Sequence, residues 1–273
     1  MALPSDYLLG STDAEHERLI RQAARIAPVT EQLFREGGIG PGHTVLDLGS
    51  GVGDVALLLG RLVGPSGRVV GIDRDGRSLR RARQRVSDAA LANVTFVEVD
   101  LAEFTSDSPF DAVVGRFILQ FLPDPIAVLR SITRVVRPGG LVAFQECAWG
   151  PFALLSAHLP LWSAAVSLVH DVSVRAGVRI EMGPALHRTF QDAGLPAPRM
   201  RLVMELGHDP EFTRWLSDVV WSVRPLIEKF ALPTEPVGDL DTLQDRLHKE
   251  VASANAVVPW LALVNAWCRT PVK

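Results

Sequence analysis

Three closely spaced glycines follow a short apolar run. Residues 45–54 read VLDLGSGVGD, which places Gly49, Gly51 and Gly53 after the run and Asp54 directly behind them. Glycine accepts positive φ and has no Cβ, so a ligand can approach its backbone closely. A glycine-rich turn between a strand and a helix also leaves N–H groups free at the helix N-terminus. The spacing indicates a turn that binds a small molecule. The alternative is a tight turn that only packs a helix on a strand.

The residues around the turn narrow the type of ligand. The spacing is GxGxG, whereas the dinucleotide fingerprint GxGxxG would have a small residue where Asp54 stands. No Lys-Ser or Lys-Thr pair follows, which excludes a phosphate-binding P-loop. An acid on the first helical turn repels a pyrophosphate and favours a cationic group. We therefore expect a nucleoside-like ligand without a phosphate chain.

Two aspartates end neighbouring strand patterns. Asp73 closes VVGID and Asp100 closes FVEVD, and in open α/β sheets ligands bind outside the carboxyl ends of the strands. A carboxylate at Asp73 can accept both hydroxyls of a ribose, and one at Asp100 can accept the exocyclic amine of adenine. Each could instead cap the following helix, although Asp75, which precedes RSLRRARQR, is the better cap candidate. The glycines and the two acids, in this order, favour a binding site.

The elements that would position these residues alternate between strand and helix patterns. Apolar, β-branched runs predict strands, and apolar residues at three- to four-residue spacing predict helices. The expected strands are 44–48, 68–73, 93–100, 110–117 and 141–148, and the expected helices are 13–36, split near Pro28, 55–63, 77–90 and 125–136. This alternation predicts an α/β fold with a doubly wound parallel sheet.

The second half of the chain has a different pattern. The expected helices are 152–176 with a break at Pro160, 182–195, and 210–253 with a break at 233–239, and the expected strands are 198–206 and 257–269. The two late strands would complete a seven-stranded, mostly parallel sheet. We predict an N-terminal helical segment covering the cofactor (1–40), a cofactor-binding α/β core (41–151, 181–209 and 255–273), and a helical cap over the substrate site (152–180 and 210–254).

Composition limits the classes of function. The 273 residues carry 28 Lys and Arg against 31 Asp and Glu, so no overall field attracts nucleic acid or an acidic membrane surface. Two cysteines cannot form a disulfide framework. The first residues lack a signal-peptide pattern, and no apolar run approaches the ~18–20 residues of a membrane span. The seven histidines are scattered, which predicts no metal site. We expect a cytoplasmic protein.

The motifs together resemble a known family. VLDLGSGVGDVAL, GID at 71–73, VEVD at 97–100, FDAVVGRF at 110–117 and RPGGLVAFQE at 137–146 resemble the class I S-adenosylmethionine-dependent methyltransferases, in their order and usual spacing. YLLGSTDAEHERLIRQ (7–22) and NAWCR resemble a bacterial small-molecule subgroup that serves secondary metabolism. The resemblance implies a Rossmann-like methyltransferase fold and S-adenosyl-L-methionine as the cofactor.

The resemblance also implies roles for individual residues. Gly49, Gly51 and Gly53 would line the methionine and ribose portion, and Asp73 would bind the ribose. The other residues expected around the cofactor are Asp47, which would steady the turn, Ser50, Arg74, Asp100 and Leu101 at the adenine, Arg116 and Phe117 at the sulfonium, and Tyr7 from the N-terminal segment. Members of this class often have a histidine after the fourth strand, where this chain reads RFILQFLPDP and offers Gln120. That departure weakens the case for a general base there.

The acceptor is expected above the ends of the fourth and fifth strands, under the cap. Glu146 is the best candidate for orienting or deprotonating it, and His170 is a second catalytic candidate; Gln120, Gln145 and Trp149 are candidates for substrate binding. Ordinary packing is the alternative for each of them. The apolar cap segments FALLSAHLPLW and WLSDVVWSV favour a small, partly hydrophobic acceptor.

Methyl transfer from a sulfonium mainly needs alignment, and positioning two reactants can supply ~7–11 kcal/mol without an acid or a base. We expect methylation of oxygen, nitrogen or carbon in a small molecule, with homodimerisation open. A nicotinamide-dependent oxidoreductase is the rival, although the chain lacks a catalytic Tyr-x-x-x-Lys. A non-catalytic nucleoside-binding module is a third hypothesis. The arginine-rich run 77–85 could suggest a nucleic-acid face, but a solvated helix face is favoured.

Overall fold

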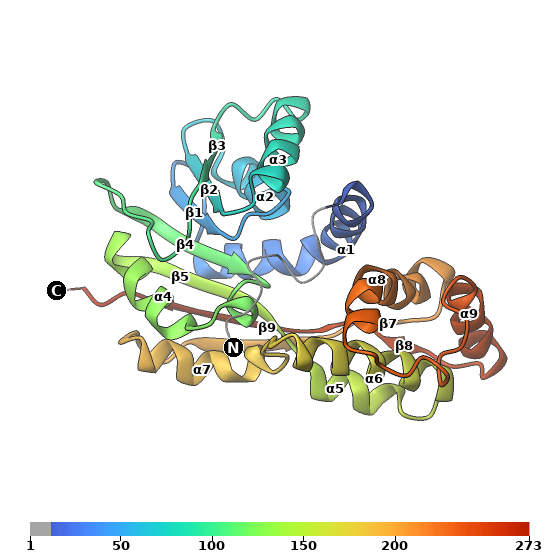
Figure 1. The fold of residues 1–273 in the computed structure, drawn as a ribbon. Helices are drawn as coiled ribbons and strands as arrows, with labels where there is room; N and C mark the ends of the chain where they lie inside the picture. Colours follow the sequence, from blue (N-terminus) through green and yellow to red (C-terminus); the bar gives the residue numbers. More distant parts are fainter. Residues whose placement is uncertain (1–11, 273) are drawn as a thin grey trace. The chain divides into compact units, whose positions relative to one another are not determined.

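The computed structural model describes residues 12–272, and these divide into two compact units. The first, called the sheet unit here, comprises residues 12–146, Gly183–Arg201 and residues 264–272 of the described chain. The second, called the helical unit, comprises Cys147–Met182 and Leu202–Leu263. The elements are shown in Figure 1. The predicted cap segments 152–180 and 210–254 both fall within the helical unit, and their role over a substrate stays a prediction.

The sheet has seven strands in the order β3-β2-β1-β4-β5-β9-β6. Their bounds are β1 Thr44–Leu48, β2 Arg68–Asp73, β3 Val94–Glu98, β4 Phe110–Arg116, β5 Val136–Ala148, β6 Arg199–Val203 and β9 Ala262–Arg269. The pairs β1–β2, β1–β4, β2–β3 and β4–β5 are parallel. The predicted doubly wound, mostly parallel sheet is confirmed, and the carboxyl ends of its first five strands meet at one edge.

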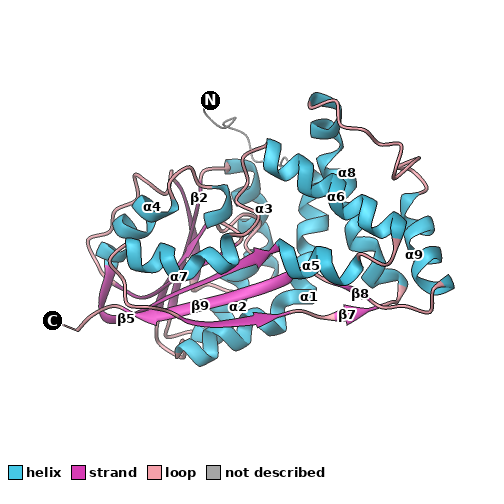
Figure 2. Cartoon of the chain, turned by 90° about the horizontal axis from the view of Figure 1, so that it is seen from below, coloured by secondary structure: helices cyan, strands magenta, loops and turns pink. Residues whose placement is uncertain are grey.

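Helices cover both faces of this sheet. They are α1 Asp13–Gly37, α2 Asp54–Val63, α3 Gly76–Asp88, α4 Pro125–Ile132 and α7 Met182–Asp192, with short 3-10 turns η1 Leu119–Phe121 and η2 Thr133–Val135. In Figures 1 and 2, α2 and α3 lie on one face and α4 and α7 on the other. The strands are therefore enclosed on two sides, which explains why they read as continuous apolar runs: Val45, Val69 and Val114 are all fully buried.

Helix α1 differs from the sequence prediction. It runs without a split from Asp13 to Gly37 although Pro28 lies inside it. A proline removes one N–H donor from the helix, but residues on both sides of it, Ile26 and Val29, are buried and hold the two halves on one axis. The helix begins at a Thr12 cap and ends at Gly38, whose φ of 85° is the left-handed conformation typical of a helix C-terminus.

The helical unit contains α5 Trp149–Ser156, α6 Pro160–Arg175, α8 Pro210–Lys229, α9 Leu243–Ser253 and an antiparallel pair of short strands, β7 Leu206–Gly207 and β8 Val258–Pro259. The predicted break at Pro160 is confirmed, because α6 begins there. The Glu250 carboxylate caps α6 by accepting from the N–H groups of Leu161 and Trp162 at 2.7 and 2.8 Å. Among residues 12–272, no helix combines the length and the apolar character needed to cross a membrane.

Candidate cofactor site

The glycine turn connects β1 to α2 in left-handed backbone conformations. The φ angles of Gly49, Gly51 and Gly53 are 64°, 50° and 85°, a region that residues with a Cβ occupy only at a cost. The Ser50 N–H donates to the carbonyl of Ile72 at 3.0 Å, and the Gly53 N–H donates to the carbonyl of Ser50 at 2.8 Å. The turn is thereby fixed to the end of β2, and the expectation of positive φ is confirmed at all three glycines.

The three glycines differ in what surrounds them. A Cβ on Gly49 would lie 2.5 Å from Cδ1 of Ile118, and one on Gly53 would lie 3.0 Å from Cβ of Ala82. A Cβ on Gly51 would meet no atom of the described residues 12–272 within 4 Å. Gly49 and Gly53 therefore make room for packing inside the protein. Of the three, only Gly51 faces open space where a ligand could reach the backbone.

Asp73 ends β2 beside this open space. Its Oδ2 accepts from the N–H of Gly51 at 2.8 Å, and its Oδ1 accepts from the N–H of Asp75 at 2.9 Å. Burial raises the pKa of Asp73, and these backbone donors oppose that rise. A carboxylate oxygen can accept more than one hydrogen bond, so Asp73 can hold the glycine turn and also receive hydroxyl groups of a ligand.

Asp100 and its neighbours are less enclosed. Asp100 lies two residues beyond the end of β3, is exposed, and its Oδ1 accepts from the N–H of Ala102 at 2.9 Å. This is the turn-capping arrangement that the sequence left open as the alternative. Leu101 is buried and Arg74 is exposed. Contacts of these three residues with an adenine or a ribose stay predictions.

Two polar atoms near the turn lack partners within the described chain. Oδ2 of Asp47 and Oγ of Ser50 are both buried without a hydrogen bond to residues 12–272. Burial raises the pKa of Asp47 to about 8, with Arg116 opposing the rise. Buried polar groups are normally hydrogen-bonded. These two atoms at the carboxyl edge of β1 are consistent with a site that a polar ligand completes.

Asp54, directly behind the glycine turn, is engaged in an ion pair. Its Oδ1 pairs with Nη1 of Arg85 on α3 at 2.7 Å, and the same nitrogen donates to the carbonyl of Val52 at 2.6 Å. Both side chains of the ion pair are mostly buried. The expectation that an acid at this position favours a cationic ligand stays a prediction. The charge is balanced within the protein, by a residue on the helix after the second strand.

The turn after β4 covers the first glycine. Nη1 of Arg116 donates to Oγ1 of Thr30 on α1 at 3.2 Å. Phe117 has a φ of 54°, unusual for a residue other than glycine, and its N–H donates to the carbonyl of Gln145 at 2.9 Å. Ile118, which the sequence analysis did not select, packs over Gly49. Its only signal in the sequence is its position directly after the strand.

Gln145 is a buried link between elements. Its Oε1 accepts from Oγ1 of Thr30 at 2.8 Å, and its Nε2 donates to Oδ1 of Asn265 on β9 at 2.7 Å. Both ends of the amide are thus engaged inside the sheet unit, and the residue is 1% exposed. Its predicted contact with a substrate stays a prediction. No sequence pattern indicated that Thr30 and Asn265 bind Gln145, because the three residues are far apart in the sequence.

Glu146 and Gln120 lie next to the same turn. Oε1 of Glu146 accepts from the N–H groups of Ile118 and Leu119 at 3.0 and 2.8 Å, and its side chain is completely buried. Gln120, in the 3-10 turn η1, is also buried. Neither side chain is open to solvent, so direct contact with an acceptor stays a prediction for Gln120 and is not supported for Glu146.

The helical unit brings two other candidates together. The ring centroids of Trp149 and His170 are 5.9 Å apart, and Nδ1 of His170 lies 3.0 Å from Oδ1 of Asp171. Trp149 is buried against Phe152, whereas His170 is partly exposed. Their predicted roles in acceptor binding are not tested by this geometry. Tyr7 lies outside the described residues.

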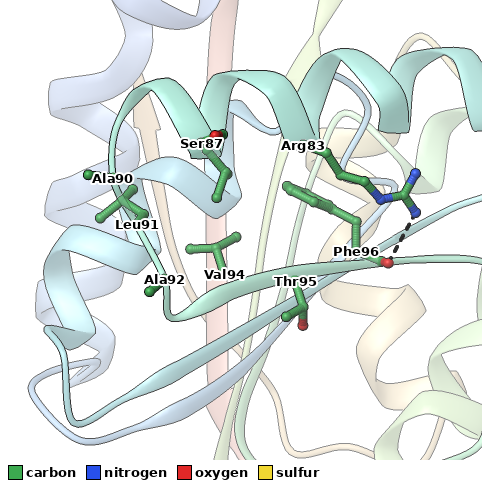
Figure 3. Close-up of a pocket in the computed structure, with 9 residues that line it drawn as sticks. Arg83, Ser87, Ala90, Leu91, Ala92, Val94, Thr95 and Phe96 are labelled. Carbon is green, nitrogen blue, oxygen red and sulfur yellow. Dashed lines mark hydrogen bonds between the residues drawn. The ribbon is translucent and has the colours of Figure 1, made fainter.

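An open apolar pocket of about 680 Å³ lies elsewhere in the sheet unit, between α3 and the edge strand β3. Figure 3 shows Leu91, Val94 and Phe96 along it, with the Arg83 guanidinium donating to the carbonyl of Phe96 at 3.2 Å. None of the predicted site residues lines this pocket. Within residues 12–272, no three His, Cys, Asp or Glu side chains are grouped as a metal ion would require.

Comparison with known proteins gives a family. Residues 39–194, more than half of the chain, match a family model described as a methyltransferase domain. A 37.1 kDa protein in transposon Tn4556 of Streptomyces fradiae is 33% identical over 175 residues, which are 63% of this chain and 48% of that protein. The ubiquinone/menaquinone biosynthesis C-methyltransferase UbiE of Pseudomonas fluorescens is 35% identical over 130 residues, 47% of this chain and 51% of that protein.

Solved structures give the same fold. A candidate methyltransferase from Bacillus halodurans matches with a TM-score of 0.60 and 15% identity over 89% of this chain and 99% of that chain. The chain spans about half the length of the curated relatives it matches. From the family model and the motifs at the sheet edge, the chain belongs to the methyltransferase-domain family, that of the class I S-adenosylmethionine-dependent methyltransferases.

Proposed function

We propose that this protein transfers the methyl group of S-adenosyl-L-methionine to a small, partly hydrophobic organic acceptor. The observation that carries the proposal is the pairing of Gly51 with Asp73. The amide of Gly51 is held by the Asp73 carboxylate at 2.8 Å, beside a backbone position where, among residues 12–272, no atom lies within 4 Å of an added Cβ. A carboxylate next to such bare backbone can accept the hydroxyl groups of a ribose.

The residues at this edge fit the cofactor. Asp73 would accept the ribose hydroxyls, the backbone of the glycine turn would lie against the methionine portion, and the unpartnered oxygens of Asp47 and Ser50 would gain polar partners. The cofactor, when bound, supplies an activated methyl group on a sulfonium. The chain's own contribution is to hold the two reactants in line and exclude water.

The proposed acceptor class rests on a relative and on the helical unit. The matched relative from Pseudomonas is by its name a C-methyltransferase of quinone biosynthesis, so a small molecule, and carbon as the methylated atom, have a precedent among relatives. Trp149 and His170 supply an aromatic surface with a polar edge in the helical unit. We propose that the acceptor contacts them, with oxygen and nitrogen as the other possible methylated atoms.

Two other functions, an oxidoreductase and a non-catalytic binding module, can be distinguished from methyl transfer. The oxidoreductase hypothesis gains no support from the family match. The non-catalytic module would bind the nucleoside but methylate nothing. We further propose a cytoplasmic location, a role in secondary metabolism and, if the chain self-associates, a homodimer.

Calorimetric titration distinguishes a methyltransferase from a nicotinamide-dependent oxidoreductase. The wild-type protein should bind S-adenosylmethionine and S-adenosylhomocysteine and show no heat with NADH. Binding of NADH alone would overturn the proposal. A screen of small-molecule extracts with a methyl-labelled donor then tests turnover. Transfer of label to a small molecule supports the enzyme, whereas tight donor binding without any labelled product supports the non-catalytic module.

A further inference from the structure

Glu146 is a charged-type side chain that is completely buried at the sheet edge. It is 0% exposed, and its Oε1 accepts two hydrogen bonds, from the N–H of Ile118 at 3.0 Å and of Leu119 at 2.8 Å. Its Oε2 is buried and has no hydrogen-bond partner among residues 12–272. One carboxylate oxygen therefore holds two consecutive backbone amides of the turn after β4.

That turn has an unusual backbone conformation. It begins at Phe117, whose φ of 54° is unfavourable for a residue with a side chain. The N–H of Phe117 donates to the carbonyl of Gln145, the residue before Glu146. Two successive residues at the end of β5 thus hold three successive amides of the turn. Without them the backbone would be free to leave the left-handed conformation.

The turn in its held position covers the glycine turn. Cδ1 of Ile118 lies 2.5 Å from where a Cβ on Gly49 would stand, and its Cβ 3.2 Å away. A shift of Ile118 would therefore uncover Gly49 or collapse onto it. The contact links the carboxyl end of β5, through the turn after β4, to the residues next to the open space at Gly51.

We propose that Glu146 is a positioning residue that fixes the turn at 117–119 over the glycine turn, and that it does not remove a proton from the acceptor. The proposal rests on the proposed function only for the expected effect on cofactor affinity. The contact between Glu146 and the backbone of the turn is given by the hydrogen bonds alone.

The protonation of Glu146 is consistent with this role. Burial raises the pKa of Glu146 to about 8, while the amides of Leu119, Ile118 and Gln120 oppose that rise. At neutral pH the carboxyl therefore keeps its proton. Because Oε1 accepts two N–H groups, the proton belongs on Oε2. A neutral carboxylic acid that is sealed from solvent is poorly suited to accept a further proton.

The neutral acid has a close mimic in glutamine. Glu146→Gln keeps an oxygen that can accept from both amides and places an NH₂ group where the protonated oxygen stands. Glu146→Ala removes the acceptor and leaves both amides without it. Asp124→Ala is the matched control, because the Asp124 carboxylate also accepts a backbone N–H, of Ala127 at 2.9 Å, on the exposed end of α4 further along the same connection.

The first measurement is amide hydrogen exchange by mass spectrometry over residues 117–121, which needs no ligand. Glu146→Ala should accelerate exchange there by about tenfold or more, and Glu146→Gln and Asp124→Ala should leave it at the wild-type rate. The second is calorimetric titration with S-adenosylhomocysteine. Glu146→Ala should weaken affinity about tenfold, and Glu146→Gln should stay within about twofold between pH 6 and 7.5.

Several results would overturn the proposal. Unchanged exchange and affinity in a folded Glu146→Ala variant would remove the positioning role. A general base at this position would lose about 10²- to 10⁴-fold in kcat in Glu146→Gln, together with the ionisation in the pH profile, while S-adenosylhomocysteine bound normally. If Glu146→Ala does not fold, Glu146→Gln still decides, through its pH profile and its exchange. Wild-type protein that fails to bind S-adenosylhomocysteine contradicts the proposed function. The positioning role of Glu146 is then tested by the hydrogen-exchange experiment alone.

Discussion

Replacing Asp73 with alanine tests the link between the glycine turn and the cofactor. Asp73 has two functions in this account: it accepts from the N–H groups of Gly51 and Asp75 at 2.8 and 2.9 Å, and it would accept the ribose hydroxyls. The substitution removes both sets of bonds at once. The two effects are measured separately, by unfolding and by ligand binding.

The expected magnitudes follow from the bonds lost. A hydrogen bond to a charged group contributes about 1.5–3 kcal/mol, so losing the ribose contact should weaken binding of S-adenosylhomocysteine roughly 10- to 150-fold. In the unliganded protein the substitution removes the acceptors of two backbone N–H groups, which lowers stability. It also removes a buried carboxyl whose pKa is raised by burial, and this offsets part of the lost stability. We therefore expect affinity to fall by a larger free energy than stability.

Calorimetric titration measures the affinity, and urea unfolding measures the stability. Asp111→Ala is the matched control, because the Asp111 carboxylate also accepts a backbone N–H, of Thr44 at 2.8 Å, and pairs with Arg137 at 2.7 Å, but at the opposite ends of β1 and β4. The control should lose stability and keep its affinity. A folded Asp73→Ala variant that binds S-adenosylhomocysteine within twofold of wild type would refute the reasoning.

Three further predictions concern the same region. Gly51→Ala should lose about 1–2 kcal/mol of stability because of its left-handed backbone, and it should bind S-adenosylhomocysteine more weakly in calorimetry. Gly53→Ala, whose Cβ would lie 3.0 Å from Cβ of Ala82, should lose more stability in urea unfolding and less affinity. Equal losses of affinity in the two variants would contradict this distinction. The pKa of Glu146 is raised from 4.5 to about 8, so the unfolded chain ionises this carboxyl at a lower pH than the folded chain does. Wild-type stability should therefore fall relative to Glu146→Gln between pH 4.5 and 8, by up to about 5 kcal/mol; a stability difference that does not vary with pH in urea unfolding would contradict this. Thr30→Val removes the donor to Gln145 and should destabilise the protein by about 1–3 kcal/mol; a change below about 0.5 kcal/mol in urea unfolding would argue against the link.

The sequence predicted the features that depend on residues close together in the chain. Continuous apolar runs fixed the strands because both faces of a parallel sheet are buried, and the glycine turn appeared where the spacing indicated. Asp73 was selected for its position at a strand end, and the structure places it 2.8 Å from the Gly51 amide. These features depend on neighbouring residues, which a pattern can register.

The features that were missed or wrong depend on distant residues. The ion pair of Asp54 was missed because Arg85, its partner, lies on another helix. The hydrogen bonds of the Gln145 amide were missed because Thr30 and Asn265, its partners, lie on α1 and β9. Pro28 suggested a split in α1 because proline weakens a helix locally, whereas burial on both sides keeps this one continuous. No local pattern encodes such pairings.

A crystal structure of the protein with S-adenosylhomocysteine is the most direct test of the central claim. We expect the ribose hydroxyls within hydrogen-bond distance of the Asp73 carboxylate and the nucleoside in the open space beside Gly51. A nucleoside bound elsewhere, for example in the pocket between α3 and β3, with the Asp73 carboxylate left facing only backbone, would contradict it.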